Sequence, residues 1–519
     1  MFYYSNVMSN DNSYLDFFSY LRRFSKVPSL EYIAEFSAEL EKNKCASHKE
    51  FYFNSSSLVK NSTYVTQFAL AFIASEIILR GDYFRKKVMT YNDLLLASNH
   101  YLNLDVTKFS FEPVEVSLIR MAHEQFYYQS EGYYSIVRMK EMISLCFELD
   151  KELERNFQII TGLNEEQYFW MTFIIYTAAV YNKGRFDRKY FFKDNEIIKK
   201  LKGILEYRIF DAYMKRVACC LSDFSESNVE SRNQFDKYQG GLYKYKFNLL
   251  RKYPIIHFSK IIKGYHEPKC EFVVPNSKLM LLKTIDGIYW ELRDWYLEKE
   301  SDKRHFLKIW GSAFEKYVED VLIRIYDRQS VFKVSSIIDD KNKNADLILI
   351  NKDEIVIFEC KGGFLPIDVQ FALNRVEFDS WIKKRLIEKE GLVQLITTEE
   401  RIINSPWGRK QNIEDKKIIK VLITYQNSYL NMIKPYFLKL ANNCDLFFNN
   451  PETFVIMSIA ELELMECLAP EVKFYDLISS VDKERSSFLE EMKKRSTDRL
   501  YNTFLNEKWE NSFKIIDKQ

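Results

Sequence analysis

The sequence predicts a multidomain protein in which a mostly α-helical N-terminal region precedes an α/β domain with a mixed central sheet. Three observations lead to this prediction. The 519 residues include only 14 glycines and 10 prolines, less than half of the average usage of about 7% and 5%. Hydrophobic residues make up 47% of the chain, which argues for packed cores and against global disorder. Helical apolar spacing prevails early in the chain, and short β-type runs begin only after residue 330.

Residues 1–300 form the predicted helical region. Its two longest apolar runs, 68–79 and 168–181, fall short of the ~18 to 20 residues that cross a bilayer, so we expect buried core helices and no membrane contact. The first residues lack a basic segment followed by an unbroken apolar run, and we therefore expect no signal peptide. We expect this region to act as a sensor, as an oligomerisation surface or as a docking site for a protein partner.

A basic and aromatic stretch closes the helical region. It runs KYQGGLYKYKFNLLRKYPII, with glycines at 240 and 241 and Pro254 marking a break. Its cations are Lys244, Lys246, Arg251 and Lys252. Two interpretations are open: packing between domains with solvated lysines, or contact with the phosphates of a nucleic acid.

Helices and strands alternate beyond residue 279. In chain order the sequence predicts a helix at 279–296, a helix at 305–326, strands at 332–338, 345–350 and 355–360, helical segments from 368 to 403, a strand at 417–426, a helix at 429–440, a strand at 453–459 and terminal helices. Strands enclosed by helices on both sides predict a mixed sheet. The predicted boundaries are 1–300 for the helical region, 301–470 for the α/β domain and 471–519 for a C-terminal helical tail.

Charge, cysteine and histidine content exclude several classes of function. Lys and Arg (75) nearly balance Asp and Glu (73), so the chain is not a purely electrostatic nucleic-acid binder. The eight cysteines lack CxxC spacing, which favours free thiols in a reducing cytoplasm over a zinc site or a disulfide scaffold. The six histidines show neither HxH nor HExxH spacing, and there is no GxxxxGK[ST] loop. A zinc hydrolase, a histidine-based nuclease and a P-loop ATPase are therefore unsupported.

The segment NADLILINKDEIVIFECKGGF carries the candidate chemistry. It predicts a strand that begins near Asp346, a polar turn at 351–354 and a second strand that ends at Glu359, Cys360 and Lys361. Side chains alternate along a strand, so Glu359 and Lys361 share one face and Cys360 points to the other. Hairpin pairing brings Asp346 beside Glu359. Glu-x-Lys occurs elsewhere in the chain, but only this copy ends an apolar strand beside an acid-bearing strand.

Two carboxylates and a lysine at one place suit phosphodiester hydrolysis. Magnesium prefers hard oxygen ligands and keeps several waters, so a phosphate oxygen and an attacking water can join the site. A neighbouring lysine can orient or help deprotonate that water and offset charge that grows on the phosphate. A carboxylate such as Glu359 at the end of a buried strand needs a partner or a metal ion.

With these residues the segment from about 305 to 460 resembles the PD-(D/E)XK nuclease superfamily, which has the restriction-endonuclease-like fold. The resemblance implies that Asp346 and Glu359 hold Mg²⁺ together with the main-chain carbonyl of Cys360, that Lys361 positions the water, and that Mn²⁺ can substitute. Glu315, on the helix at 305–326, matches the helical glutamate of the family. Ala345 stands where the family name has proline.

The resemblance extends to the helices after the site. Gln370 and Gln394 are candidates for the helical glutamine that some members keep near the metal. Candidates for phosphate contact are Lys383, Lys384, Arg385, Arg409 and Lys410, for which a solvated helix face is the alternative. Basic residues outnumber acidic ones between 401 and 450.

Taken together, the sequence predicts a cytoplasmic, Mg²⁺-dependent nuclease that cleaves DNA. The preference for DNA and a role in restriction or antiviral defence follow from the resemblance alone. Two alternatives stay open at this point. One is a catalytically silent nucleic-acid-binding or interaction scaffold that keeps the fold, and the other is a nuclease that acts on RNA.

Overall fold

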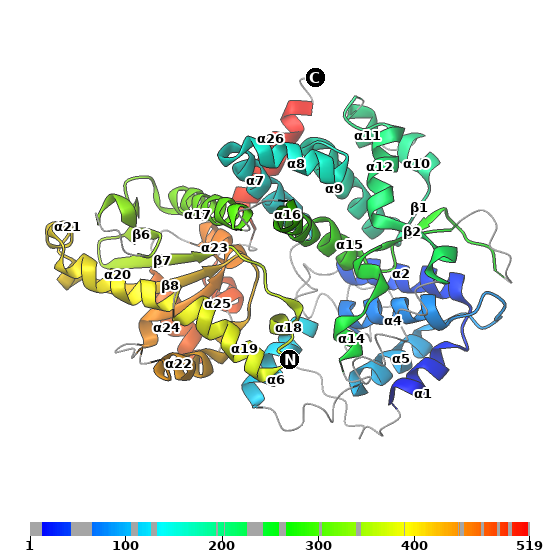
Figure 1. Cartoon of the computed structure of the whole chain (residues 1–519), viewed down its shortest axis with the longest axis horizontal. Helices are drawn as coiled ribbons and strands as arrows, with labels where there is room; N and C mark the ends of the chain where they lie inside the picture. Colours follow the sequence, from blue (N-terminus) through cyan, green and yellow to red (C-terminus); the bar gives the residue numbers. More distant parts are fainter. Residues whose placement is uncertain are drawn as a thin grey trace.

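The computed structural model describes most of the chain. The described residues are 13–42, 65–104, 113–125, 132–193, 196–201, 203–225, 242–258, 266–299, 304–338, 344–388, 390–444, 446, 451–468, 472–484, 488–496 and 501–516. They are largely helical and include two mixed sheets, as Figure 1 shows. The predicted order, helical first and α/β afterwards, is confirmed at this level of detail.

Helices dominate the described residues up to 299. They are α1 (Ser13–Leu21), α2 (Lys26–Lys42), α4 (Gln67–Arg80), α5 (Tyr91–Asn103), α6 (Val114–Gln125), α7 (Tyr133–Leu149), α8 (Lys151–Thr161), α9 (Glu165–Tyr181), α10 (Arg188–Lys193), α11 (Glu196–Lys200), α12 (Tyr207–Val217), α14 (Tyr243–Lys246), α15 (Ser277–Thr284) and α16 (Asp286–Lys299). The two apolar runs lie in α4 and α9, which are buried on nearly all sides. The helix predicted at 279–296 is two helices instead, with a break at Ile285.

A small four-stranded sheet lies within this region, and the sequence did not predict it. Its strands are β1 (Arg185–Phe186), β2 (Ala218–Cys220), β3 (Ile255–His257) and β4 (Phe272–Val273), in the order β1-β4-β3-β2. Strands β2 and β3 are parallel, and the other pairs are antiparallel. Strands of two or three residues are too short to show an alternating pattern, so the expectation of helix throughout was wrong here.

The second sheet has five strands in the order β5-β6-β7-β8-β9. They are β5 (Val331–Lys333), β6 (Leu347–Ile350), β7 (Glu354–Lys361), β8 (Lys417–Thr424) and β9 (Phe454–Ser458). Strands β5, β6 and β7 pair antiparallel, whereas β7, β8 and β9 run parallel. The predicted strands and the predicted mixed sheet are therefore confirmed. The first strand is shorter than expected, because the chain turns into a 3₁₀ helix at Val334–Ser336.

Helices surround this sheet. They are α17 (His305–Tyr326), α18 (Ile367–Gln370), α19 (Arg375–Ile382), a π-helical turn (Lys383–Ile387), α20 (Leu392–Asn404), α21 (Pro406–Lys410), α22 (Lys434–Asn442), α23 (Ile459–Leu464), α24 (Phe474–Glu484), α25 (Phe488–Arg495) and α26 (Thr503–Ile516). The helix expected at 429–440 begins as a 3₁₀ turn at Leu430–Ile433 and continues as α22.

The five-stranded sheet is the middle of three layers, which Figure 1 shows edge-on among its helices. Val356 and Phe358 of β7 face a core that includes α17 and α24, whereas Ile355 and Ile357 face a core that includes α19, α20 and α22. Burial on both faces explains why β7 reads as a continuous apolar run. Helix α6, far earlier in the chain, also joins the second core.

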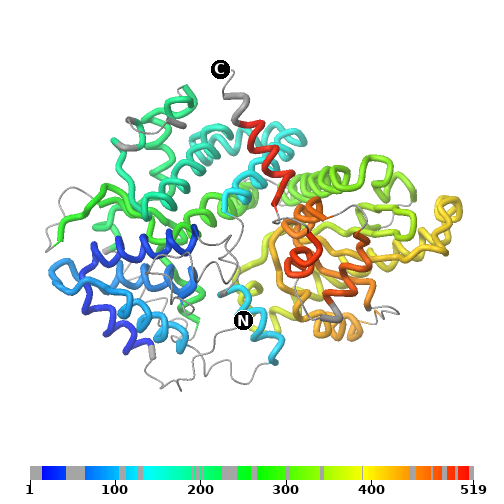
Figure 2. The backbone as a smooth tube through the Cα atoms, turned by 180° about the vertical axis from the view of Figure 1, so that it is seen from behind, coloured from blue at the N-terminus to red at the C-terminus, as the bar shows by residue number. Residues whose placement is uncertain are grey.

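The hydrophobic cores cross the predicted boundaries at 300 and 470. One core contains residues of α7, α9, α16 and α17, one face of the sheet, and α24 to α26. The side chain of Trp509 in α26 packs against Trp170 and Phe173 of α9, with ring centroids 4.9 and 4.2 Å apart. Figure 2, from behind, shows α26 lying between the helical part and the α/β part. If the three segments packed independently, each would have its own core. These contacts instead join residues of all three in one core.

The basic and aromatic stretch packs inside the protein. Lys244 is 4% exposed and lies between the rings of Tyr101 and Tyr245, with its Nζ 3.5 Å from Glu124 Oε1. Lys246 forms an ion pair with Asp368. Arg251 donates to the carbonyl of Tyr245 at 2.6 Å. These contacts favour the packing interpretation over phosphate contact. The glycines at 240 and 241 lie outside the described residues.

Candidate active site

The β6–β7 hairpin brings the predicted acidic residues together. Leu347 pairs with Phe358, and the amide of Asp346 donates to the carbonyl of Phe358 at 3.0 Å. Asp346 therefore lies opposite Glu359 at the point where β7 approaches its end. The Oδ2 atom of Asp346 accepts a hydrogen bond of 2.7 Å from the amide of Cys360, which fixes the carboxylate against the end of β7.

Glu359 is the most deeply buried of these carboxylates, at 2% exposure. Its Oε1 accepts a hydrogen bond of 2.5 Å from Lys361 Nζ. Its Oε2 is buried and has no hydrogen-bond partner among the described residues. Burial, followed by the charge of Asp346, raises the pKa of Glu359 well above its usual range. The site thus holds a carboxylate oxygen for which the described protein offers no donor.

Asp346 shares this electrostatic environment. Burial raises the pKa of Asp346, and the hydrogen bond from the Cys360 amide offsets only part of that effect. Both carboxyl groups are therefore hard to ionise in the folded chain. A cation beside them would favour their ionised forms.

Lys361 supplies one positive charge. Burial lowers the pKa of its amine, but the charge and hydrogen bond of Glu359, together with the charges of Asp346 and Glu390, outweigh burial and raise the pKa overall. The side chain also reaches Glu390 Oε2 at 3.9 Å and Gln394 Oε1 at 3.5 Å. Lys361 is therefore a protonated cation held among acceptors from β7 and from the start of α20.

Glu315 on α17 faces the site. Burial, followed by the charge of Asp346, raises its pKa to about 7, and the Lys333 and Lys361 charges act in the opposite sense. No hydrogen bond or ion pair joins its side chain to another described residue. The helical glutamate is thus within electrostatic reach of Asp346 and Lys361.

Gly362 explains how α17 comes so close. A Cβ atom at this position would lie 2.9 Å from Cβ of Phe314, the residue before Glu315. The carbonyl of Gly362 accepts a hydrogen bond of 2.8 Å from Trp310 Nε1. The glycine therefore permits a close approach of the end of β7 to helix α17. Gly363 has open space around it.

An aromatic cluster borders the site on the far side of these glycines. Phe364 lies between the rings of Tyr289 and Tyr425, with centroids 4.3 and 4.9 Å away. Trp310 of α17 packs against Tyr289 and Tyr425 at 4.9 and 5.7 Å. This cluster connects α16, α17 and β8, and it holds the segment after Lys361 in place.

The two candidate glutamines differ in position. Gln394 lies in the first turn of α20, where its Nε2 donates to the carbonyl of Asn344 at 2.8 Å and its Oε1 accepts from the amide of Gly391 at 3.0 Å. It thereby connects Lys361 to the segment that carries Asp346. Gln370 is buried in α18, and no hydrogen bond joins it to the carboxylates of the described site.

The basic candidates separate into two groups. Lys383, Lys384 and Arg385 form the π-helical turn, with Lys384 and Arg385 exposed. Arg385 is among the charges that act on the pKa of Tyr289, which burial raises, so it lies near the aromatic cluster. Arg409 and Lys410 are exposed in α21, at the outer end of α20 in Figure 1. A helix of 13 residues extends about 20 Å, which keeps this pair away from Lys361.

Besides the carboxylates, the metal-ligating side chains of the described residues are the cysteines and histidines. In the described part of the chain, the candidate site included, no three His, Cys, Asp or Glu side chains are arranged so that together they could hold a metal ion. The described cysteines are free thiols, as expected, and Cys45 lies outside the described residues. His257 contacts Cys220 in the small sheet, with 3.3 Å between its Nδ1 and the thiol sulfur, and belongs to a different part of the molecule.

The donor set fits a hard divalent cation even though the carboxylates do not form a closed ligand shell. Buried Oε2 of Glu359 lacks a donor, Asp346 and Glu359 meet across the hairpin, and Glu315 faces them without an ion pair among the described residues. Carboxylate oxygens with water completing the shell are what magnesium prefers. Lys361, at 2.5 Å from Glu359, compensates one of the negative charges in this structure.

One residue of the site was missed by the sequence reasoning. Glu390 lies four residues before Gln394 and approaches Lys361. In the sequence it stands in the charged run EKE, where each glutamate looks like a solvated residue. It precedes Gly391, the N-cap of α20, and therefore lies outside the helix, so no helical spacing in the sequence marks it.

Comparison of the chain with family models, with curated proteins and with solved structures finds no match. Among the described helices, none is both long enough and apolar enough to span a bilayer.

Proposed function

We propose that this chain is a magnesium-dependent nuclease that hydrolyses phosphodiester bonds in DNA. The observation that carries the proposal is the convergence of Asp346, Glu359 and Lys361 on paired strands, with a buried oxygen of Glu359 left without a donor. The mixed five-stranded sheet with helices on both faces supports a restriction-endonuclease-like fold.

Asp346 and Glu359 would hold the metal ion, with Glu315 and the main-chain carbonyl of Cys360 as further ligands. When bound, Mg²⁺ supplies Lewis acidity toward the phosphate and lowers the pKa of a bound water. Mn²⁺ offers the same chemistry to an oxygen-rich site.

The chain's own residues have distinct tasks in this proposal. Lys361 keeps its proton, because the adjacent Glu359 carboxylate raises the pKa of its amine. It therefore serves as a fixed cation that orients water and offsets charge growing on the phosphate, rather than as the base. Gln394 and Glu390 position the ammonium group of Lys361. Arg385, exposed beside the aromatic cluster, would contact a neighbouring phosphate of the DNA strand.

A cleavage assay tests the proposal. Purified full-length protein is incubated with linear duplex, circular and single-stranded DNA and with RNA, in Mg²⁺ or Mn²⁺. We expect DNA cleavage by the wild type and a loss of about 100-fold or more in Glu359→Gln and Lys361→Met. The matched control is Glu354→Gln, which changes an equally buried glutamate at the other end of β7 and should retain activity.

Each other outcome has a defined meaning. Equal cleavage by the wild type and by both site variants would contradict the assigned residues. Cleavage confined to RNA would replace the substrate and keep the site. No cleavage of any substrate by the wild type would favour the catalytically silent scaffold.

A further inference from the structure

The strongest unassigned feature lies in the helical part, at a concave pocket of about 390 Å³. Three arginines line it, together with an aromatic ring and an apolar side chain. The lining residues are Arg22, Leu79, Arg80, Gly81, Asp82, Tyr83 and Arg85. Pockets of this volume fall within the range of about 300 to 1,000 Å³ that small-molecule sites occupy.

The walls of the pocket are two connections held together by backbone hydrogen bonds. One is the turn between α1 and α2, and the other follows α4. Ser25 and Asp82 form a parallel β-bridge, the amide of Lys26 donates to the carbonyl of Asp82 at 3.0 Å, and the amide of Ser25 donates to the carbonyl of Lys87 at 2.7 Å. The shape of the pocket is thus set by main-chain geometry rather than by mobile side chains.

The three arginines are not equivalent. Arg80 is 10% exposed and is fixed by Glu76, whose Oε2 lies 3.2 Å from its Nε, and by the ring of Phe18, 4.3 Å from its guanidinium carbon. Arg85 is 60% exposed and has Asp82 at 3.7 Å. Arg22 is exposed, and its side chain forms no hydrogen bond or ion pair with another described residue. The pocket is therefore lined by one buried cation with fixed contacts and by two exposed cations.

Helix dipoles do not cancel the positive charge of the arginines. The helices α1 and α4 end here with a partial charge of about −0.5 each, and α2 begins here with about +0.5. Arg80 is paired with Glu76, so among the lining side chains Arg22 and Arg85 face Asp82 alone, which leaves about one positive charge against the summed dipoles of about −0.5. The pocket is therefore left with a positive balance.

We propose that this pocket binds a phosphorylated small molecule that carries at least two negative charges, and specifically a nucleotide. Planar guanidinium groups match phosphate oxygens in pairs, which a single lysine does not. Leu79 is buried at 6% exposure, so the side chain that can contact the organic part of such a ligand is Tyr83, whose ring centroid lies 4.7 Å from Lys26 Nζ. The three cations line one concavity, which suits a compact ligand better than a nucleic-acid strand, because a strand needs a continuous groove.

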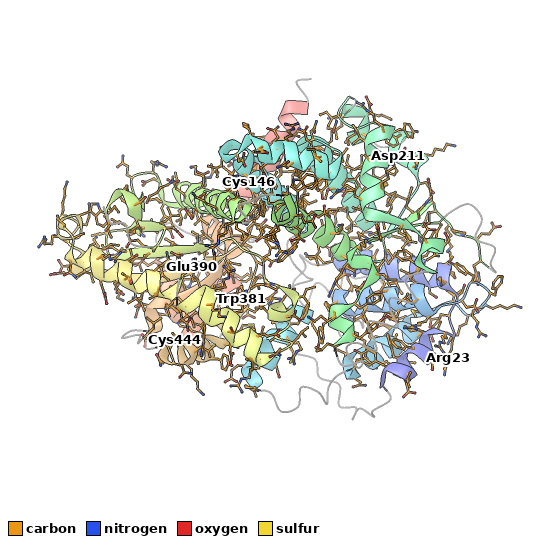
Figure 3. The ribbon with its side chains drawn as sticks, in the orientation of Figure 1. Arg23, Cys146, Asp211, Trp381, Glu390 and Cys444 are labelled. Atoms are coloured by element: carbon orange, nitrogen blue, oxygen red, sulfur yellow. The ribbon has the colours of Figure 1, made fainter. Side chains whose placement is uncertain are left out.

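The pocket is remote from the carboxylate site. Figure 3 labels Arg23, the neighbour of Arg22, at one side of the molecule and Glu390, which contacts Lys361, in the α/β part. The proposal goes beyond nuclease activity and does not depend on it, because ligand binding is measured without cleavage.

The test is calorimetric titration of the full-length protein with ATP, with AMP and with inorganic pyrophosphate. EDTA is present so that no metal-bridged complex forms at the carboxylate site. We expect saturable binding of ATP by the wild type and at least tenfold weaker binding by the Arg22→Gln/Arg85→Gln double variant. The matched control is Arg23→Gln, which changes an exposed arginine that does not line the pocket and should bind like the wild type.

Arg80 is left intact because its substitution disturbs the buried contacts with Glu76 and Phe18. A second variant, Tyr83→Ala, should weaken ATP binding while leaving pyrophosphate binding unchanged. The absence of binding by the wild type, or equal ATP binding by the double variant, would overturn the proposal. A third result would also overturn it: the wild type binds a 15-nucleotide single-stranded DNA through Arg22 and Arg85 but does not bind ATP. That result would assign the arginines to nucleic acid.

Discussion

Two glutamates of strand β7 have the same burial and very different partners. Glu354 and Glu359 are each 2% exposed. Both oxygens of Glu354 accept main-chain hydrogen bonds, from Phe474 at 3.2 Å and Tyr475 at 3.0 Å, where they cap the start of α24. Glu359 has Lys361 on one oxygen and no described donor on the other. The fold satisfies the carboxylate of Glu354, whereas one oxygen of Glu359 has no donor among the described residues, which is where the proposed cation would bind.

The residues of the site were predictable to different degrees. Asp346, Glu359 and Lys361 are fixed by strand alternation and hairpin pairing, which local sequence encodes. The direction in which Glu315 points was not predictable. A residue at the edge of a helix's apolar stripe can face the sheet or the solvent until the neighbouring elements are placed. The contrast between Glu354 and Glu359 also required the structure, since it depends on α24, more than one hundred residues later.

A histidine far from this site gives the chain a pH dependence. His123 is fully buried against the ring of Tyr429, with centroids 4.9 Å apart, and burial lowers its pKa to about 3. A histidine in the unfolded chain has a pKa of about 6.5. Below that pH the unfolded chain binds a proton that the folded chain does not bind. The stabilisation is therefore complete above pH 6.5 and is lost as the pH falls toward 3.

We expect the free energy of unfolding of the wild type to fall by about 1.4 kcal/mol per pH unit more steeply than that of His123→Gln between pH 6 and 4.5. Urea denaturation at several pH values measures this difference. Parallel pH profiles of the two proteins would rule out the buried neutral histidine as its source.

At the level of elements, α17 and β7 form the scaffold of the site. Gly362 lets the end of β7 approach Phe314, and Trp310 donates to the carbonyl of the same glycine. The position of Glu315 relative to Asp346 follows from this approach. The sequence predicted both elements, α17 with its bounds and β7 to within a residue at each end, because continuous burial leaves a strong apolar pattern.

Gly362→Ala should push α17 away from β7. The added Cβ would lie 2.9 Å from Phe314 Cβ, so we expect a loss of stability of about 1 to 3 kcal/mol and reduced cleavage. Gly363→Ala is the matched control, because nothing lies within 4 Å of its added Cβ. Thermal denaturation and the cleavage assay on both variants measure the two effects, and equal behaviour of the two variants would refute the packing argument.

For the molecule as a whole, a buried ion pair joins the helical part to the α/β part. Arg138 of α7 contacts Glu463 of α23 through two hydrogen bonds, of 2.7 and 2.5 Å. Glu463 also accepts from Tyr317 of α17 and from Asn502, each at 2.7 Å. Four segments that are distant in sequence thus meet at one carboxylate. No local pattern encodes such a meeting, so only the structure shows that residues on both sides of 300 and 470 share a core.

Arg138→Met should destabilise the whole chain. It leaves the charge of Glu463 buried without its guanidinium partner, and such truncations cost about 3 to 5 kcal/mol. Lys473→Met removes an ion pair with Asp353 whose side chains are 50% and 52% exposed, and it should leave the free energy of unfolding nearly unchanged. Urea denaturation compares them, and a similar small effect of both substitutions would show that the buried pair does not hold the parts together.

The most direct test of the central claim is metal binding, measured without any substrate. Free Mn²⁺ is followed by electron paramagnetic resonance during titration of the full-length protein. We predict saturable binding by the wild type, an unchanged affinity in Glu354→Gln, and an affinity at least tenfold weaker in Glu359→Gln. Absence of binding by the wild type, or equal affinity of the Glu359→Gln protein, would contradict the assignment of Asp346 and Glu359 as a cation site.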